Sequence, residues 1–490
     1  MHKRGILQSM EPLDAAACYQ ALCTHDVRFD GQFFVGVRST GIYCRPICPA
    51  KTPKEENCTF YPHAASAERA GFRPCLRCRP ELAPGNAVAS VDAIAELARQ
   101  AASRIEDGAL SEKSVADLAD ELGVSERHLR RAVESAFGVS PIALAQTQRL
   151  LLAKRLLTDT SLPITQIAFA SGFASVRRFN HVFQERYRLT PTDLRRSTDR
   201  AEVETLTVSL GFRPPLAWPE LLAFLQNRTL VGVEAVLDQT YCRTVQIGEH
   251  KGWLKVTATE QTLQVTLSHS LAQALPQTLA RVKRLFDLTA NPLPISARLG
   301  ELAESCPGLR VPGAFQGFET AVRAILGQQV SVKAATTLAS RFVAALGEPL
   351  VTPFPMLTHL SPTPERVAQA SKHELIASGI LESRAAAILA LAQAVHEQRL
   401  SLEPGGSIPA KLAQLQALPG IGEWTAQYIA MRALTWPDAF PHTDLGVKKA
   451  LGLTTNQEIL AHAERWQPWR AYAVMHLWRS LETNDTEKTR

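Results

Sequence analysis

The chain has 490 residues, of which 46 % are hydrophobic and 20 % charged, as in folded globular proteins rather than disordered ones. The formal net charge is only +6, so total charge does not identify an anionic partner. Gly5–Leu7 is too short for a signal-peptide core, and no stretch approaches the roughly 20 apolar residues of a membrane span. We therefore expect a cytoplasmic protein with no membrane partner, whose cysteines bind metal or react rather than form disulfides.

The cysteines are concentrated near the start of the chain, where seven of the nine precede residue 79. Cys44 and Cys48 are separated by three residues, and Cys75 and Cys78 by two. This is the pair spacing of a zinc site with four thiolate ligands. Cys58 lies between the pairs and is expected to be a spare thiol. We predict one zinc ion per chain; the simpler alternative is that this metal only folds the loop.

The residues around these cysteines favour a chemical role as well. Eight basic residues against three acidic ones lie between Arg38 and Arg79, and such a patch, with Arg45 as a candidate contact, suits a phosphate backbone. Four thiolates around a divalent zinc ion carry two net negative charges, which oppose DNA binding. Alkylation of one thiolate would remove one of these charges. A zinc-bound thiolate is also ionised at neutral pH and can act as a nucleophile.

The sequences "FFVGVRSTGIYCRPIC" and "FRPCLRC" resemble the zinc domain of the bacterial Ada adaptive-response regulators, over residues 14–82 and after a tail of residues 1–13. The resemblance implies irreversible transfer of a methyl group from a DNA methylphosphotriester to the first cysteine of the cluster, here Cys44. It also implies that the methylated protein activates sequence-specific transcription.

Residues 83–198 begin with a predicted linker, "APGNAVA", and continue with two helix-turn-helix units. The first covers Ser114–Gln146, with a turn at Gly123 and Ser125 as the cap of its second helix. The second covers Leu162–Arg195, and a helix around residues 148–158 joins the two. Polar side chains on the two second helices are candidate contacts to successive major grooves: Arg127, His128, Arg130, Arg131, Arg177, Arg178, Asn180 and His181.

One such unit alone would equally fit a helical hairpin with a solvated basic face, but two copies favour DNA binding. The segment resembles the DNA-binding domain of AraC-type activators, which implies promoter DNA and RNA polymerase as partners. Arg188 stands where the second unit normally carries glycine, and this departure puts the local turn in doubt.

Residues 204–286 are predicted to form a small α+β domain. The alternating segments "ETLTVSL", "RTVQIGE", "GWLKVTAT" and "TLQVTLS" predict strands, and helices are expected at Trp218–Gln226 and Pro276–Phe286. These patterns alone indicate no function.

Residues 287–490 are mainly helical and contain "LQALPGIGEWTAQYIAMRAL". Leu418–Gly422 predicts a tight hairpin in which Gly420 and Gly422 allow the backbone to turn, and the amides that follow can receive a phosphate. Asp444 comes 22 residues after Gly422, in a loop before another helix. A hairpin without catalysis is the alternative, but the aspartate favours an enzyme.

This layout resembles the helix-hairpin-helix DNA glycosylases, and residues 204–482 resemble bacterial 3-methyladenine glycosylase II, AlkA, whose first domain is TBP-like. The resemblance implies excision of N-alkylated bases such as 3-methyladenine and 7-methylguanine in base excision repair. It assigns Asp444 to stabilising the cationic sugar, and Trp424, Tyr428 and Trp478 to the base pocket. Cationic bases stack well on such rings.

Two departures refine this expectation. Trp424 occupies the place of the lysine found in strand-cleaving relatives, and no cysteine follows Cys306, so a monofunctional enzyme without an iron–sulfur cluster is implied. Gln329 replaces the leucine wedge that fills the vacated stack.

Together these patterns predict a multidomain, mainly α protein with α+β parts that repairs alkylated DNA and regulates transcription. We expect a monomer, associated with the bacterial nucleoid, that binds damaged and promoter double-stranded DNA. The alternative is a transcription factor whose C-terminal half binds an effector or DNA without catalysis. A weaker one is an enzyme whose helix-turn-helix units only tether it to DNA.

Overall fold

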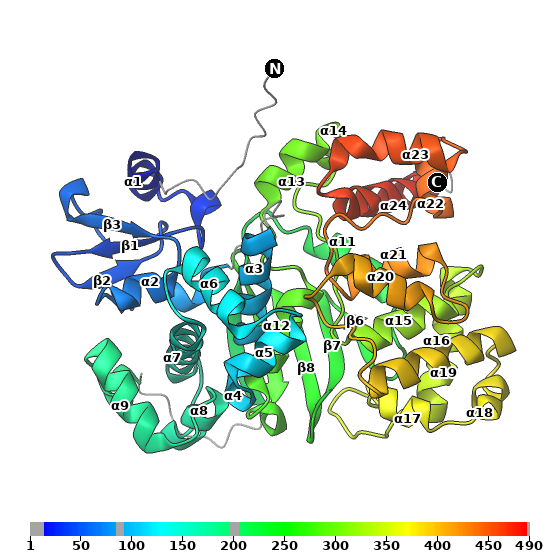
Figure 1. The fold of residues 1–490 in the computed structure, drawn as a ribbon, viewed down its shortest axis with the longest axis horizontal. Coiled ribbons are helices and arrows are strands. Elements are labelled where there is room, and N and C mark those ends of the chain that lie inside the picture. The colour runs from blue at the N-terminus through cyan, green and yellow to red at the C-terminus, as the bar shows by residue number, and fades with distance from the viewer. Residues whose placement is uncertain (1–13, 85–92, 196–204, 488–490) are drawn as a thin grey trace. The chain divides into compact units, whose positions relative to one another are not determined.

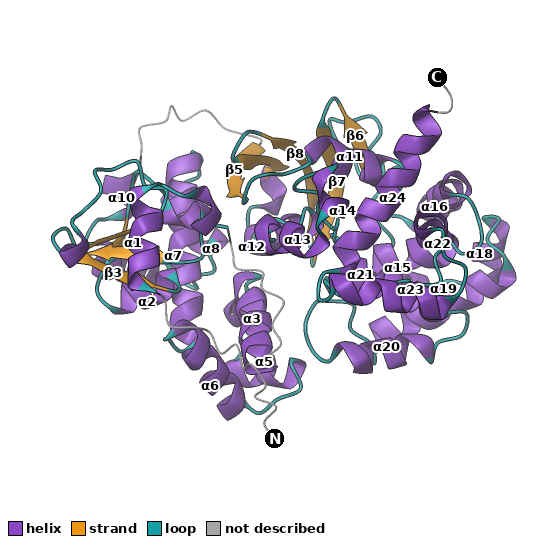
Figure 2. Cartoon of the chain, turned by 90° about the horizontal axis from the view of Figure 1, so that it is seen from above, coloured by secondary structure: helices purple, strands orange, loops and turns teal. Residues whose placement is uncertain are grey.

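A computed structural model describes residues 14–84, 93–195 and 205–487. The predicted tail (1–13) and most of the predicted linker (83–89) lie outside these ranges. The chain divides into two compact units, of which the first is Met1–Glu202 with Gly211–Arg213 and Leu275–Gln277, and the second is the remainder. Both are rich in helices (Figure 1 and Figure 2), which confirms the mainly α fold with α+β parts. No helix of the described ranges is long and apolar enough to cross a bilayer.

The first unit begins with a small sheet that carries the zinc-site cysteines. Its strand order is β3-β1-β2-β4, with β1 antiparallel to both neighbours and β4 parallel to β2. Cys44 is the last residue of β2, and Cys75 follows β4 directly, so the sheet brings the two cysteine pairs together. The elements are α1 (Ala15–Cys23), β1 (Phe34–Val37), β2 (Ile42–Cys44), β3 (Cys58–Tyr61), α2 (Ala64–Arg69) and β4 (Arg73–Pro74).

The rest of the first unit contains the two predicted helix-turn-helix pairs. Gly123 and Gly172, with φ of +71° and +83°, make the two turns, and Ser125 caps the helix that follows it by accepting from His128 N–H. The helices are α3 (Ala93–Glu106), α4 (Ala109–Glu112), α5 (Val115–Glu121), α6 (Glu126–Phe137), α7 (Pro141–Asp159), α8 (Ile164–Ala170), α9 (Val176–Tyr187) and α10 (Pro191–Leu194).

Arg188 takes the place that glycine takes in the first pair. α6 ends at Gly138 with φ of +70°, and α9 ends at Arg188 with φ of +54°. Each backbone N–H donates to a carbonyl four residues earlier, Glu134 or Gln184, at 2.9 Å. The turn therefore forms without glycine, although a side chain makes the left-handed conformation less favourable.

Within this unit, buried charges join the zinc-binding segment to α7. Lys154 and Glu81 form an ion pair at 2.5 Å, with both side chains almost completely buried. Glu68 is buried and accepts hydrogen bonds from Thr147 at 2.9 Å and from Tyr43, the neighbour of Cys44, at 3.1 Å. The ion pair spares Lys154 and Glu81 the large cost of a lone buried charge, and the hydrogen bonds reduce the cost of burying Glu68.

The second unit begins with the predicted α+β segment. Its sheet has the order β5-β9-β8-β7-β6, and β6 (Glu234–Leu237) is the strand that the sequence analysis did not predict. The remaining elements match the predicted positions: β5 (Thr205–Gly211), α11 (Trp218–Gln226), β7 (Thr240–Ile247), β8 (His250–Ala258), β9 (Thr262–Ser268) and α12 (Leu275–Leu285).

A helical bundle follows, and it shares its core with the α+β segment. Leu230 and Val233, which precede β6, pack in one buried cluster with residues from α15, α19 and α21. The helices are α13 (Pro292–Leu299), α14 (Glu301–Glu304), α15 (Gly317–Leu326), α16 (Val332–Leu346), α17 (Pro364–Ala368), α18 (Lys372–Ala377), α19 (Glu382–His396), α20 (Ile408–Gln416), α21 (Glu423–Arg432), α22 (Leu445–Leu451), α23 (Asn456–Ala463) and α24 (Arg470–Glu487).

Candidate functional site

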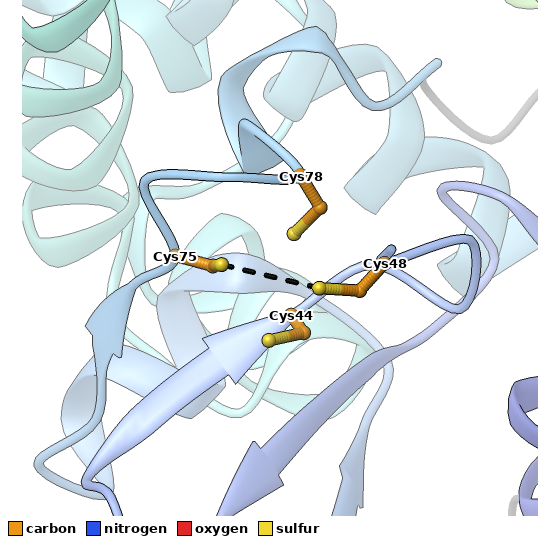
Figure 3. A group of neighbouring side chains, drawn as sticks. All are labelled: Cys44, Cys48, Cys75 and Cys78. Carbon is orange, nitrogen blue, oxygen red and sulfur yellow. Dashed lines mark hydrogen bonds between the residues drawn. The ribbon is translucent and has the colours of Figure 1, made fainter. Parts of the chain in front are cut away.

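Cys44, Cys48, Cys75 and Cys78 converge on one point (Figure 3), with all four sulfur atoms within 4.8 Å of one another. Cys48 Sγ and Cys75 Sγ are 4.0 Å apart. A tetrahedral site with zinc–sulfur bonds of about 2.3 Å needs sulfur–sulfur separations of about 3.8 Å, so the four side chains fit a zinc ion. Cys58 lies outside this group, on β3, as expected for a spare thiol.

Backbone N–H groups also point at the cluster. Arg45 N–H donates to Cys78 Sγ at 3.3 Å, and Arg77 N–H donates to Cys75 Sγ at 3.4 Å. Such donors stabilise negative charge on sulfur, as a thiolate site requires. Taken over the whole residue, Cys44 is half-buried and the other three ligands are buried, although the group that the four cysteines form is itself buried. Cys44 is thus the least buried residue of the four.

Arg45 is a predicted DNA contact, but its side chain is bound inside the protein. Its guanidinium forms an ion pair with Asp30, and Nη1 donates to the carbonyl of Cys78 at 3.0 Å. The side chain is only 11 % exposed. A guanidinium paired in this way would have to give up buried partners to bind a phosphate, so Arg45 supports the zinc loop from inside. Arg38, Lys51 and Arg77, from the same basic segment of the sequence, are exposed.

The candidate contacts on the two recognition helices lie largely on the surface. Arg127, His128 and Arg131 are exposed on α6, whereas Arg130 is half-buried and pairs with Glu126 at 2.5 Å. The members on α9 are all exposed: Arg177, Arg178, Asn180 and His181.

In the second unit the hairpin forms where the sequence predicts it, between α20 and α21. Gly420 has φ of +75°, and a Cβ there would lie 3.0 Å from the Cβ of Ala387. The positive φ thus favours glycine, and a side chain would also crowd Ala387. Gly422 is exposed at the start of α21, whose first amides have no partner within the helix. This hairpin can receive a DNA phosphate.

Asp444 is the N-cap of α22, and three N–H groups converge on its carboxylate. Oδ1 accepts from Val447 N–H at 3.0 Å and from Trp478 Nε1–H at 2.9 Å. Oδ2 accepts from Trp424 Nε1–H at 2.8 Å. A Cβ at Gly446 would lie 2.9 Å from both Asp444 Oδ1 and the Trp478 ring, so a larger residue would displace them. The carboxylate is half-buried and held in one orientation.

The predicted aromatic residues surround this carboxylate. Trp424 and Tyr428 stack with centroids 5.4 Å apart, and Tyr428 lies 6.2 Å from Trp478. Three other tryptophans of this part of the chain are not members of the group: Trp466 and Trp469 are buried, and Trp436 is half-buried. The structure thus brings Trp424 and Tyr428 of α21, Trp478 of α24 and Asp444 at the start of α22 together.

Sequence reasoning missed other members of this group. Phe224 of α11 stacks on Trp478 at 6.1 Å and 13°, and the guanidinium of Arg228 lies 3.8 Å from the Phe224 centroid. Arg432 is buried and donates to the hydroxyl of Tyr428 at 2.9 Å. Phe224 belongs to a correctly predicted helix, but no local pattern relates it to a tryptophan more than two hundred residues later.

The arginines also affect the chemistry of Tyr428. Burial alone would raise the pKa of its hydroxyl, but the guanidinium groups of Arg432, Arg228 and Arg323 together lower that pKa. The aromatic group thus adjoins positive charge from these arginines and the carboxylate of Asp444, which accepts from two of its rings. A cationic base would be attracted toward the carboxylate.

Gln329 lies in the loop between α15 and α16, where it is exposed and has φ of +52°. It therefore lies at the surface, as a residue that enters a DNA stack must.

Family models match the chain in four places. They are the metal binding domain of Ada (17–81), a helix-turn-helix domain (118–197), the AlkA N-terminal domain (207–316) and the HhH-GPD superfamily of base excision DNA repair proteins (322–468).

Three relatives match different lengths of the chain. A probable bifunctional transcriptional activator/DNA repair enzyme AlkA of Mycobacterium tuberculosis is 39 % identical over 96 % of this chain and 97 % of its own. DNA-3-methyladenine glycosylase 2 of Escherichia coli is 40 % identical over 55 % of this chain and 96 % of its own. The bifunctional transcriptional activator/DNA repair enzyme AdaA of Bacillus subtilis is 32 % identical over 38 % of this chain and 84 % of its own.

Proposed function

Since this chain belongs to the family of bifunctional transcriptional activator/DNA repair enzymes that join an Ada metal-binding domain to an AlkA glycosylase, we propose that it repairs alkylated DNA by two reactions and regulates transcription. It is a DNA-3-methyladenine glycosylase II that also accepts methyl groups from DNA methylphosphotriesters. The observation that carries the glycosylase is the carboxylate of Asp444, held by Trp424 and Trp478 beside stacked rings.

The glycosylase reaction requires that the damaged base leave the helix, because its bond to the sugar is inaccessible within the stack. The flipped base stacks on Trp424, Tyr428 and Trp478, and a cationic base gains cation–π attraction there. As the bond from the sugar to the base breaks, its electron pair leaves with the base and the sugar becomes cationic. Asp444 stabilises this positive charge, and water then adds to the sugar carbon and loses a proton.

A cationic base is already a good leaving group, so the protein needs little acid catalysis. Trp424 offers no amine for attack on the sugar, which supports a monofunctional enzyme that leaves the strand intact. We propose that Gly420 and Gly422 bind the phosphate beside the lesion, and that Gln329 fills the space left in the stack.

The second reaction takes place at the cysteine cluster. A bound zinc ion would be held by Cys44, Cys48, Cys75 and Cys78, and would keep the sulfurs ionised at neutral pH. Cys44 Sγ attacks the methyl carbon of the phosphotriester, so that a carbon–sulfur bond forms. The bond from that carbon to the phosphate oxygen breaks, its electron pair stays on the oxygen, and an ordinary phosphodiester remains. The partial exposure of Cys44 supports its choice as the acceptor.

Methylation then regulates DNA binding, because the cluster loses one negative charge near exposed basic residues. The recognition helices α6 and α9 supply contacts to promoter DNA, through exposed residues such as Arg127, Arg131, Arg177, Arg178 and His181. We also propose that the protein acts in the cytoplasm at the bacterial nucleoid, as a monomer, and recruits RNA polymerase.

A single assay tests the central proposal: the purified chain is incubated with methylated duplex DNA, and released free bases are separated by chromatography. Release of 3-methyladenine is expected. No release, together with tight binding to the same DNA, would instead indicate a transcription factor with a non-catalytic C-terminal half.

A further inference from the structure

A five-residue loop, Gly327–Ser331, joins α15 to α16 and carries Gln329 at its exposed centre. Val330 is also exposed, by 37 %. The far end of the loop is fixed, because Ser331 Oγ accepts from Ala334 N–H at 3.2 Å and caps α16. Arg323 adds a hydrogen bond to the carbonyl of Val332 at 3.3 Å.

The near end of the loop is fixed through one residue, Gln328. Its Nε2 donates to the carbonyl of Gly420 at 2.8 Å and to the hydroxyl of Thr425 at 2.9 Å. The buried guanidinium of Arg384 donates to the backbone carbonyl of the same residue. Gly420 belongs to the hairpin, and Thr425 directly follows Trp424 in α21. Gln328 thus connects the loop to the hairpin and to the helix that forms one wall of the base pocket.

These contacts leave Gln328 no amide hydrogen with which to recognise DNA. Both hydrogens of its amide nitrogen are used inside the protein, so the side chain has no donor left for a base. Its partners belong instead to the hairpin and to α21. A side chain inserted into the DNA has to be positioned accurately relative to both of these elements. Opening a base pair is unfavourable by a few kcal/mol, and a misplacement of about 1 Å at such a site reduces rates by about a hundredfold.

We infer that Gln328 is a positioning residue for base flipping: it holds the Gln329 tip at a fixed place relative to the phosphate-binding hairpin and to Trp424. This inference rests on the proposed glycosylase function. In "GQQVS", the first glutamine, Gln328, supports the second, Gln329, and Gln329 is the residue that enters the stack.

The test uses the full chain and the variant Gln328→Met, which keeps similar length but has no donors. Single-turnover release of 7-methylguanine is measured from a duplex with the base paired to cytosine, and from one with the base opposite an abasic site. Flipping is less costly in the second duplex, because no pair has to be broken. We expect about a tenfold loss of rate on the paired base, and a loss within about threefold on the unpaired base.

Gln369→Met, at an exposed position after α17, is the matched control and should match the parent on both duplexes. Gln328→Glu keeps the side-chain length but lacks the amide donors, and it should give the same selective loss if the methionine variant folds poorly. Equal losses on both duplexes, or no loss on the paired base, would overturn the inference.

Fluorescence of 2-aminopurine beside the lesion separates this inference from the proposed function, since it reports stack opening without cleavage. The parent should give a larger signal than Gln328→Met. A parent that opens the stack but releases no base would contradict the proposed glycosylase function. In that case the difference in fluorescence between the parent and Gln328→Met would still test the positioning role of Gln328.

Discussion

The indole Nε1–H of Trp424 donates a hydrogen bond to Oδ2 of Asp444 over 2.8 Å. One residue therefore has two tasks, because its ring faces Tyr428 in the aromatic group while its N–H orients the carboxylate. The indole Nε1–H of Trp478 likewise donates a hydrogen bond to the other carboxylate oxygen, Oδ1. Recognition of the base and stabilisation of the cationic sugar are thus coupled through the same side chains.

The first prediction concerns Asp444→Asn, which keeps the shape but removes the charge. An electrostatic contribution of this kind is worth roughly 3–4 kcal/mol, so the rate of base release should fall about a hundred- to a thousandfold. DNA binding should persist or improve, since a negative charge near phosphates is lost. Single-turnover release of 3-methyladenine with saturating protein is the measurement. A rate within a few-fold of the parent would show that Asp444 is not the catalytic carboxylate.

Two substitutions at Trp424 should separate its tasks. Trp424→Phe keeps an aromatic face but loses the N–H, so we expect about a tenfold slower release, about 1.4 kcal/mol, with the preference for cationic bases retained. Trp424→Ala should also weaken that preference, by roughly 1–2 kcal/mol. Competition between cationic and neutral lesions measures the preference. Trp253→Phe, whose ring packs against Phe354 instead, is the control. Equal preferences in the alanine variant and the parent would contradict the stacking role.

The zinc site gives a third prediction. The chain should bind one zinc ion, Cys48→Ser should lose it, and Cys58→Ser should retain it, as measured by metal analysis after desalting. After exposure to methylated DNA, one methyl group should be found on Cys44. Because Pro46 follows Arg45, trypsin leaves Cys44 and Cys48 in one peptide. Fragment ions must therefore locate the methyl group, and a methyl group on Cys48 would overturn the assignment.

Methylated protein should bind its promoter more tightly than unmethylated protein. A phosphate about 10 Å from the removed charge gains about 0.4 kcal/mol at the dielectric constant of water, which is about twofold in affinity, and several phosphates multiply this effect. The difference should shrink as salt is raised, because the interaction is screened. Titrations at several salt concentrations provide the test, and their slopes count the phosphates engaged. Equal affinities at low salt would exclude the electrostatic explanation.

The last prediction concerns Glu68, between the zinc segment and α7. Burial raises the pKa of its carboxyl from 4.5 to about 7, although hydrogen bonds from Thr147 and Tyr43 oppose the shift. A carboxyl with a raised pKa in the folded state binds its proton more tightly there. Its stabilising contribution is complete below the unfolded pKa and is lost as pH rises through about 7. At about pH 8 the loss reaches about 3 kcal/mol.

Glu68→Gln resembles the protonated form and should remove this pH dependence, so the first unit should be more stable than the parent at about pH 8. The stability of the first unit is measured at several pH values by hydrogen exchange of peptides from α2 and α7, with a correction for the intrinsic effect of pH on exchange. Tryptophan fluorescence would not serve, since all seven tryptophans follow residue 217. Glu56→Gln, at an exposed position, is the control. A parent and a Glu68→Gln variant with the same pH profile would contradict the prediction.

The sequence by itself determined the features that depend on near neighbours. The spacing of Cys44, Cys48, Cys75 and Cys78 was sufficient to predict a zinc site whose sulfurs converge, because tight turns place each pair. Caps and periodicity likewise located the two helix-turn-helix units, α11 and the hairpin before α21. In each of these, local geometry and hydrogen bonding within a few residues decide the conformation.

Only the tertiary structure decided which residues are in contact with one another and which remain exposed. Arg45 looked like a surface cation, but folding pairs it with Asp30 and buries it. Phe224 looked like an ordinary helix residue, but its ring stacks on that of Trp478, which is far away in the sequence. Gln328 and Gly420 are 92 residues apart and carry no mutual pattern in the sequence. The physical reason is that burial and hydrogen-bond partners depend on long-range packing, which no spacing along the chain specifies.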